Sequence, residues 1–197
     1  EVIGRLLDDF SREEMRCLIE AAYAGKFETQ DLTPVEKVGS DFVLGLFRGP
    51  TSAFKDVALS VLPRLIVASR EKLGVKDEIV ILTATSGDTG KAALEGFRDV
   101  DGVAIGVMYP DGGVSDIQFK QMATQAGDNV RVWGVRGNFD DCQTGVKNVF
   151  AACQGKELPY DLSSANSINI GRLAPQVMYY FKAYRDLMDA GTIKLGD

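Results

Sequence analysis

The feature that most constrains the fold is an alternation of short apolar runs with stretches of helical spacing. Runs rich in valine and isoleucine lie at 79–84, 103–109 and 130–135, and helical stretches lie between them at about 89–98 and 115–126. Strands that alternate with helices of this length form right-handed βαβ units, which build a parallel sheet covered by helices on both faces. We therefore predict an α/β protein with a twisted parallel sheet.

The segment before this alternation is predicted from its caps and turn residues. Ser11-Arg-Glu-Glu14 is a capping-box pattern, which predicts a helix that ends at Gly25. Residues 26–41 are polar with one proline and predict a loop. Phe42–Phe47 is a short apolar run and predicts a strand, which the following Arg-Gly-Pro ends.

Three further segments have helical spacing. The pattern at 53–73 contains Pro63, which is expected to kink or break the helix. Another helix is predicted over Cys142–Cys153, and a long one at about 171–190. The sequence shows no internal repeats and no low-complexity segments.

The chain contains no histidine, and this absence narrows the chemistry it can perform. It excludes Ser-His-Asp and Cys-His mechanisms and the usual imidazole ligands of catalytic zinc, so no metal site is expected. Proton transfer must then depend on lysine, tyrosine, cysteine, a carboxylate or a cofactor. The net charge of −6 argues against a nucleic-acid-binding or anionic-membrane surface, because either needs a basic patch. A small anionic substrate needs only a few local cations.

The cysteines and the hydropathy indicate the cellular compartment. Cys17, Cys142 and Cys153 are an odd number with no C-x-x-C spacing, and we expect buried, reduced thiols in a cytoplasmic protein. Apolar stretches fall short of the ~18 residues that a membrane span needs. The first residues lack the basic-then-apolar pattern of a signal peptide.

A first candidate site lies in Thr83-Ala-Thr-Ser-Gly-Asp-Thr-Gly90, the predicted turn from a strand into a helix. Its glycines let the backbone pass close to a ligand, and a helix N-terminus offers free N–H groups and positive dipole. Thr85, Ser86 and Thr89 add hydroxyl donors, which suit a carboxylate or a phosphate. A plain turn with serine or aspartate as the N-cap explains the segment equally well. The spacing matches neither a P-loop nor a dinucleotide fingerprint.

A second candidate is Arg48-Gly-Pro-Thr-Ser-Ala-Phe-Lys-Asp56, in which a Gly-Pro turn leads into a helix. Lysine usually prefers a solvated surface, and that interpretation stays open for Lys55. Its apolar neighbours and the helix N-terminus both disfavour the ammonium form, which lowers the pKa of the lysine. A neutral amine is what Schiff-base formation requires.

A third candidate is Leu162-Ser-Ser-Ala-Asn-Ser-Ile-Asn-Ile-Gly-Arg172, where serines and asparagines precede an arginine at a helix start. Uncharged donors that converge with one guanidinium make a clamp for an oxyanion. A surface loop followed by a capped helix is the alternative.

Together the three segments resemble the threonine synthase family, in the order and at about the spacing of that family. The family segment G-P-T-x-A-F-K-D is matched at 49–56, and L-T-A-T-S-G-D-T-G is matched without a difference at 82–90. S-A-N-S-I-N-x-x-R is matched at 164–172. The likeness covers essentially the whole chain.

The resemblance implies a fold type II, tryptophan-synthase-β-like enzyme that depends on pyridoxal 5'-phosphate. It implies that Lys55 forms the Schiff base with the cofactor and that Asp88 approaches the cofactor's phenolic oxygen. The implied substrate-binding residues fall into two groups, one for the substrate carboxylate and one for its phosphate: Thr85, Ser86 and Thr89, and Asn166, Ser167 and Arg172. Residues 1–41 are then a helix and loop leading into the catalytic region, and residues 42–197 are the α/β core.

The implied reaction converts O-phospho-L-homoserine and water into L-threonine and phosphate. A single lysine and the substrate phosphate can supply its acid–base work, which suits a chain without histidine. An oligomer is possible. The alternatives are a related enzyme such as threonine dehydratase, or an inactive fragment that binds pyridoxal phosphate or an anion.

The chain also departs from the family pattern. Family members often have E-L-F-H-G-P-T where this chain has Gly45 and Arg48, so that strand departs from the family pattern at two positions. The S-G-N-F-G loop that binds the cofactor phosphate is expected just after residue 197. We therefore expect the core to be incomplete at its C-terminal end, and the 197-residue piece alone to be inactive.

Overall fold

The computed structural model describes residues 3–166 and 169–196. Its elements follow in the order η1 (Ile3–Arg5), α1 (Arg12–Tyr23), β1 (Val35–Val38), β2 (Asp41–Leu44), α2 (Asp56–Leu73), β3 (Glu78–Ala84), α3 (Asp88–Phe97), β4 (Val103–Pro110), α4 (Asp116–Ala123), β5 (Val130–Val135), α5 (Phe139–Cys153), β6 (Tyr160–Ser163) and α6 (Ile170–Asp189). The predicted alternation of strands and helices is confirmed.

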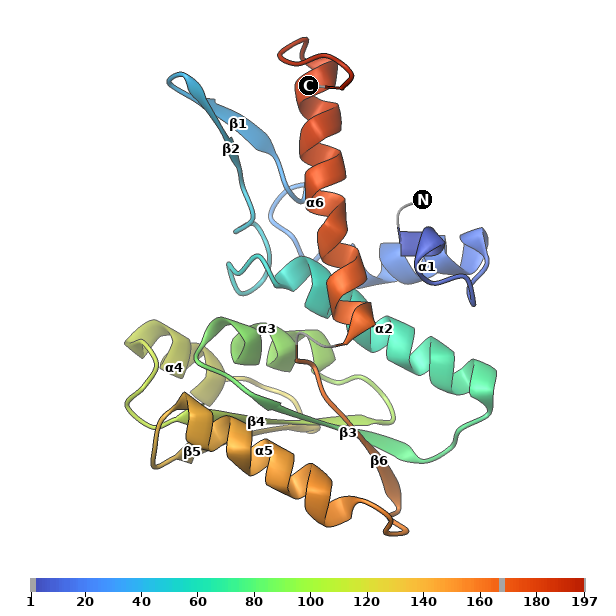
Figure 1. Cartoon of the computed structure of the whole chain (residues 1–197), viewed down its shortest axis with the longest axis vertical. Coiled ribbons are helices and arrows are strands. Elements are labelled where there is room, and N and C mark those ends of the chain that lie inside the picture. Colours follow the sequence, from blue (N-terminus) through green and yellow to red (C-terminus); the bar gives the residue numbers. More distant parts are fainter. Residues whose placement is uncertain (1–2, 167–168, 197) are drawn as a thin grey trace.

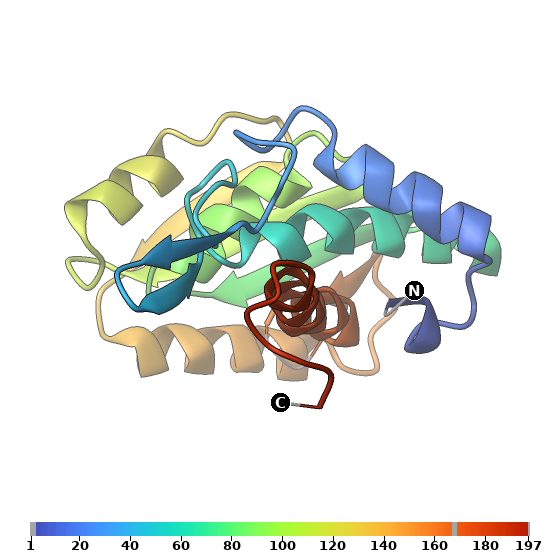
Figure 2. The ribbon, with the colours of Figure 1, turned by 90° about the horizontal axis from the view of Figure 1, so that it is seen from above.

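Four strands form a parallel sheet in the order β5-β4-β3-β6. Strand β3 is central: Ile81 is paired with Ile105 on one side and with Ser163 on the other. Figure 1 shows α2 and α3 over one face of this sheet and α5 over the other, and Figure 2 gives the same layers from above. The expectation of an α/β fold with helices on both faces is therefore confirmed.

The core lies on both faces of the sheet, as a parallel sheet requires. On one face Ile81 and Ile105 pack with Leu94 and Phe97 of α3, and all four are at most 1% exposed. On the other face a separate apolar cluster joins α5 to the strands; its buried members are Leu82, Ala84, Cys142 and Val146. Burial of this kind, at roughly 25 cal/mol per Å² of apolar surface, is the main stabilising contribution to such a fold.

Helix α2 does not break at Pro63, which lies inside one continuous helix. Proline has no N–H, so the carbonyl of Leu59 one turn earlier loses its intrahelical partner. That carbonyl instead faces the backbone of Gly96 in α3, where an added Cβ would lie 2.1 Å from the Leu59 oxygen. The two helices therefore pack with their backbones in close approach, and no side chain larger than hydrogen fits there.

Two strands were not predicted, and both are only four residues long. Strand β1 lies within the predicted loop and pairs antiparallel with β2, with Val35 opposite Leu44. Strand β6 pairs with β3 at the edge of the sheet. The hairpin β1–β2 and helix α6 extend away from the sheet on the side of α2 and α3 (Figure 1).

Within the part of the chain that the structure describes, no helix is long and apolar enough to cross a membrane. The same residues contain no group of three or more cysteine, aspartate or glutamate side chains placed to hold a metal ion.

Candidate active site at the start of three helices

The three candidate segments converge where helices α2, α3 and α6 begin. Contacts between residues far apart in the chain establish this: Lys55 with Asp88, Arg172 with Thr89, and Thr83 with Asn166. The segment 85–87 follows the carboxyl end of β3, which is the edge at which ligands bind in open parallel sheets. Three helix N-termini bring their positive dipole ends to one place, which favours anions.

The loop before Lys55 is held by the carboxylate of Asp56, which is 2% exposed. It accepts hydrogen bonds from Thr51 N at 2.9 Å, from Thr51 Oγ1 at 2.6 Å and from Ala53 N at 3.3 Å. Burial raises the pKa of Asp56, although these hydrogen bonds act in the opposite direction. Gly49 is required for this turn, because a Cβ there would lie 2.4 Å from Asp56 Oδ2. The hydrogen bonds of Asp56 thus fix the backbone of the loop that leads to Lys55.

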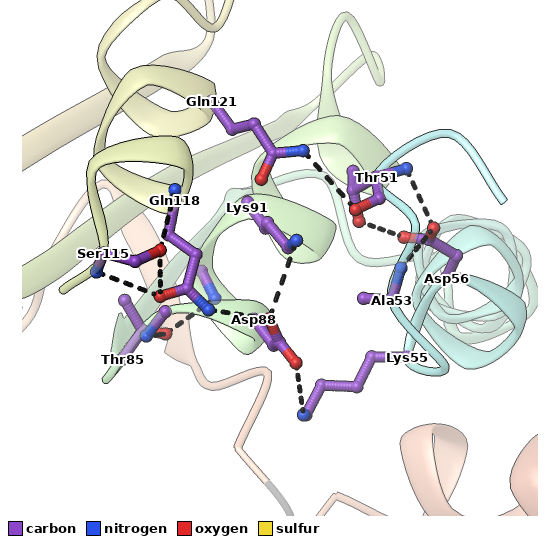
Figure 3. Close-up of polar contacts among 12 residues, drawn as sticks. Thr51, Ala53, Lys55, Asp56, Thr85, Asp88, Lys91, Ser115, Gln118 and Gln121 are labelled. Atoms are coloured by element: carbon purple, nitrogen blue, oxygen red, sulfur yellow. Dashed lines mark hydrogen bonds and ion pairs between the residues drawn. The ribbon is translucent and has the colours of Figure 1, made fainter. Parts of the chain in front are cut away.

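Lys55 points its amine toward Asp88 (Figure 3). The distance from Lys55 Nζ to Asp88 Oδ2 is 4.0 Å, and the amine also lies 4.0 Å from the centre of the Phe54 ring. The side chain of Lys55 is 15% exposed. Burial is the largest cause that lowers its pKa; Asp88 opposes this effect, and the charges of Arg172 and Lys91 add to it. The direction is the one expected from the sequence.

Asp88 is the first residue of α3 and binds side chains from two other positions. Its Oδ1 accepts a hydrogen bond from Gln118 Nε2 at 2.9 Å and lies 3.6 Å from Lys91 Nζ. Neither Gln118 nor Lys91 is among the site residues predicted from the sequence. Gln118 belongs to the capping box of α4, a purely local pattern. Lys91 follows Asp88 by three residues, a spacing at which two side chains on a helix are neighbours. This spacing is the one feature of the sequence that could have identified it.

The hydroxyl groups of Thr85, Ser86 and Thr89 have different environments and hydrogen-bond partners. Thr85 is buried, and its Oγ1 accepts the N–H groups of Gly87 and Gly90, both at 2.9 Å. Thr85 therefore accepts the N–H groups at the start of α3. The alternative interpretation of the sequence had a serine or aspartate in this capping role. Ser86 is exposed, and the Oγ1 of Thr89 accepts a hydrogen bond from Arg172 at 3.4 Å. A role for these hydroxyls in substrate binding stays a prediction.

Arg172 is 7% exposed and lies in the first turn of α6. One guanidinium nitrogen donates to the Ala165 carbonyl at 2.9 Å, and the buried Nε has no hydrogen-bond partner. In residues 3–166 and 169–196, no carboxylate lies within ion-pair distance of this guanidinium. Burial lowers the pKa of Arg172. A buried cation without a counter-ion is poised to receive an anion.

The other residues singled out from the sequence are Asn166, Ser167 and Arg48. The Oδ1 of Asn166 accepts a hydrogen bond from Thr83 Oγ1 at 2.7 Å, which fixes the orientation of the amide. Ser167 lies outside the described residues. Arg48, one of the departures from the family pattern, is turned to the β1–β2 side, where it forms ion pairs with Glu28 at 3.5 Å and Glu36 at 3.3 Å.

No family model matches the chain, but curated proteins and solved structures do. Threonine synthase of Pseudomonas aeruginosa is 44% identical over 184 residues, which cover 92% of this chain and 37% of that protein. A threonine synthase structure from yeast matches with a TM-score of 0.82 and 35% identity, over 95% of this chain and 39% of that one. PLP-bound threonine synthase from Brucella melitensis matches with a TM-score of 0.78 and 40% identity, over 89% of this chain and 37% of that one.

The fold and the site together define the class: an α/β protein of fold type II, with a lysine at the start of a helix beside the carboxyl edge of a parallel sheet. The chain spans 37% of the length of the Pseudomonas relative. Because the identity of 35–44% extends over most of this chain, the chain is homologous to the corresponding part of threonine synthases.

Proposed function

We propose that the protein is a threonine synthase, which uses pyridoxal 5'-phosphate to convert O-phospho-L-homoserine and water into L-threonine and phosphate. The observation that carries the proposal is the convergence of Lys55, Asp88 and Arg172 at three helix starts. The first two supply a reactive amine and its carboxylate neighbour, and the third supplies an uncompensated cation for a phosphate. The names of the relatives agree with this reaction.

The residues present fit the aldehyde end of pyridoxal phosphate. An aldehyde reacts with a neutral amine, and the pKa of the half-buried Lys55 amine is lowered by burial. The carboxylate of Asp88 is the polar group beside that amine, where the family resemblance places the phenolic oxygen. When bound, the cofactor supplies an electron sink for negative charge at the substrate Cα.

The other residues bind and orient the substrate. The exposed hydroxyl of Ser86 binds the substrate carboxylate at the start of α3, where Thr85 holds the turn and Thr89 contacts Arg172. Arg172 and Asn166 bind the substrate phosphate, which leaves from Cγ. Lys55 holds and moves the protons at Cα and Cβ, because its amine lies beside Asp88 and burial lowers its pKa.

A cytoplasmic location is part of the proposal. Cys17, Cys142 and Cys153 are all free thiols in the structure, and reduced thiols are typical of proteins in that compartment. The expectation that all three are buried is wrong, because Cys142 is buried but Cys153 is only partly buried and Cys17 is exposed.

The test is phosphate release from O-phospho-L-homoserine by the full-length, cofactor-loaded protein. We expect release by the wild type and a loss of about 10²–10⁴-fold in Lys55→Ala, the range typical of a lost acid–base group. The matched control is Lys147→Ala, which removes the same charge from the exposed face of α5. No release by a folded, cofactor-loaded wild type would contradict the proposal, and turnover of threonine alone would favour a dehydratase.

A further inference from the structure

Lys91 is a buried lysine for which the proposed reaction has no use. It is the fourth residue of α3, and its side chain is 9% exposed. Lysine is almost never buried to this extent unless its charge is paired. Figure 3 shows its amine between Asp88 and the loop that contains Thr51 and Asp56.

The two oxygens of the Asp88 carboxylate have different partners. Oδ1 receives Gln118 Nε2 at 2.9 Å and faces Lys91 Nζ at 3.6 Å. Oδ2 faces Lys55 Nζ at the longer distance of 4.0 Å. Lys91 and Gln118 thus determine the orientation of the Asp88 carboxylate through Oδ1. Lys55 faces the other oxygen, Oδ2.

This division matters because a carboxylate beside a lysine favours the ammonium form. With Asp88 as its full counter-ion, Lys55 would be held protonated and would not attack an aldehyde. Lys91 faces two carboxylates, since its charge also acts on Asp56. The charged groups that act on Lys55 are Asp88, Arg172 and Lys91, of which only Asp88 favours its charged form.

We propose that Lys91 is a positioning residue: it holds Asp88 through one carboxylate oxygen and serves as its counter-ion, so that Lys55 faces the other oxygen without Asp88 as its full counter-ion. The inference rests on the proposed function only for the use that is made of the Lys55 amine. In this proposal Lys91 acts through Asp88 and not on the substrate or the cofactor.

The test measures the pH at which each lysine becomes nucleophilic, by trace labelling of the cofactor-free, full-length protein with acetic anhydride and mass spectrometry of the peptides. In Lys91→Met the labelling midpoint of Lys55 is expected to move up by about one pH unit, so that labelling at neutral pH slows about tenfold. Lys91→Arg keeps the charge and is expected to keep the midpoint within a few tenths of a unit. Lys147→Met, with the same change in net charge, is expected to leave it unchanged.

The labelling midpoint does not depend on how accessible the Lys55 amine is, because accessibility changes only the maximal rate. A Lys55 midpoint in Lys91→Met equal to that of the wild type would overturn the inference, as would an equal shift of the Lys55 midpoint in Lys91→Arg.

These readouts use neither pyridoxal phosphate nor O-phospho-L-homoserine. A protein that shows the expected midpoints but releases no phosphate would contradict the proposed function and leave the role of Lys91 intact. Phosphate release together with unshifted midpoints would do the opposite.

Discussion

Among residues 3–166 and 169–196, the guanidinium of Arg172, which is 7% exposed, donates only to neutral oxygens, those of Ala165 and Thr89. A charged group is expensive to bury without an opposite charge. An anionic ligand would supply the missing charge, so this residue is the main support for the proposed phosphate site.

We predict that Arg172→Gln weakens binding of O-phospho-L-homoserine by about 10–100-fold, the equivalent of one charge-assisted hydrogen bond. The measurement is the dissociation constant by calorimetry on the cofactor-loaded Lys55→Ala protein, in which turnover is suppressed. Thr89→Val is the matched control, because it removes an oxygen that Arg172 contacts but keeps the cation, and it should cost only a few-fold. Equal affinity of Arg172→Gln and its parent would refute the assignment.

Lys55 has a second consequence, for the pH dependence of folding. Its pKa is lowered in the folded state from the ordinary 10.5, so the unfolded chain binds more protons in the window between the two values. Stability from this group therefore rises with pH through that window and is complete above 10.5. We predict that cofactor-free Lys55→Met is more stable than wild type at neutral pH, and that the difference shrinks as the pH approaches 10.5.

The measurement is urea unfolding of both proteins across that pH range. Lys147→Met, at an exposed site, should show no such trend. A stability difference that stays constant with pH would contradict the lowered pKa.

Among the elements, α2 and α3 are coupled by the contact of Gly96 with the Leu59 carbonyl that Pro63 leaves unpaired. Close approach of a Cα–H to a carbonyl is a weak favourable contact, but here it also lets the two helices pack tightly. Lys55 immediately precedes the first residue of α2, and Asp88 is the first residue of α3. The packing distance of the helices thus bears on the distance between the two side chains.

We predict that Gly96→Ala destabilises the protein by about 1–3 kcal/mol, because a methyl group 2.1 Å from a backbone oxygen forces the helices apart. Gly145→Ala is the matched control. It is also inside a helix, but its added Cβ would meet only Met108 Sδ, at 3.7 Å. Removing that glycine should stabilise by about 0.5–1 kcal/mol. Chemical denaturation of both variants checks the pair, and equal effects would contradict this account of Gly96.

The long elements could be predicted from the sequence, because their apolar periodicity and caps are local properties. The capping box at Ser11 and the valine-rich strands β3, β4 and β5 are examples. Strands β1 and β6 could not, since each has four residues, much of it polar, and exists only through its partner. The helix at 53–73 was predicted, but the break allowed for at Pro63 does not occur; the carbonyl that Pro63 leaves unpaired has its contact on a different helix.

The same distinction holds for the site. Lys55, Asp88 and Arg172 stand in recognisable segments, and the structure brings those segments together. Gln118 reaches Asp88 from a helix thirty residues away, and no local pattern reports that contact. Whether each predicted residue binds what the resemblance implies stays a prediction for the experiments above.

For the molecule as a whole, the parallel sheet and the β1–β2 hairpin differ in how they are stabilised. Strands β3 and β4 are paired on both edges and covered on both faces. The hairpin has two strands whose residues are mostly exposed. An isolated pair of strands is marginally stable, so the hairpin should open without unfolding the sheet.

We predict that amide hydrogen exchange is slowest in β3 and β4, with an opening free energy close to that of global unfolding. Exchange in Val35–Leu44 should be faster by several orders of magnitude, since only local opening is needed. Mass spectrometry of peptides from the full-length protein gives both rates in one sample. Protection of the hairpin equal to that of β3 would show that the two form one cooperative unit.

The contacts that close the site, Thr83 with Asn166 and Thr89 with Arg172, each join residues that are 83 positions apart. Because a chain is synthesised from its N-terminus, the residues of the turn at 85–87 are made before Arg172. Synthesis at roughly 5–20 residues per second separates the two by several seconds. The proposed anion clamp therefore cannot form until well after the turn that it contacts has been synthesised.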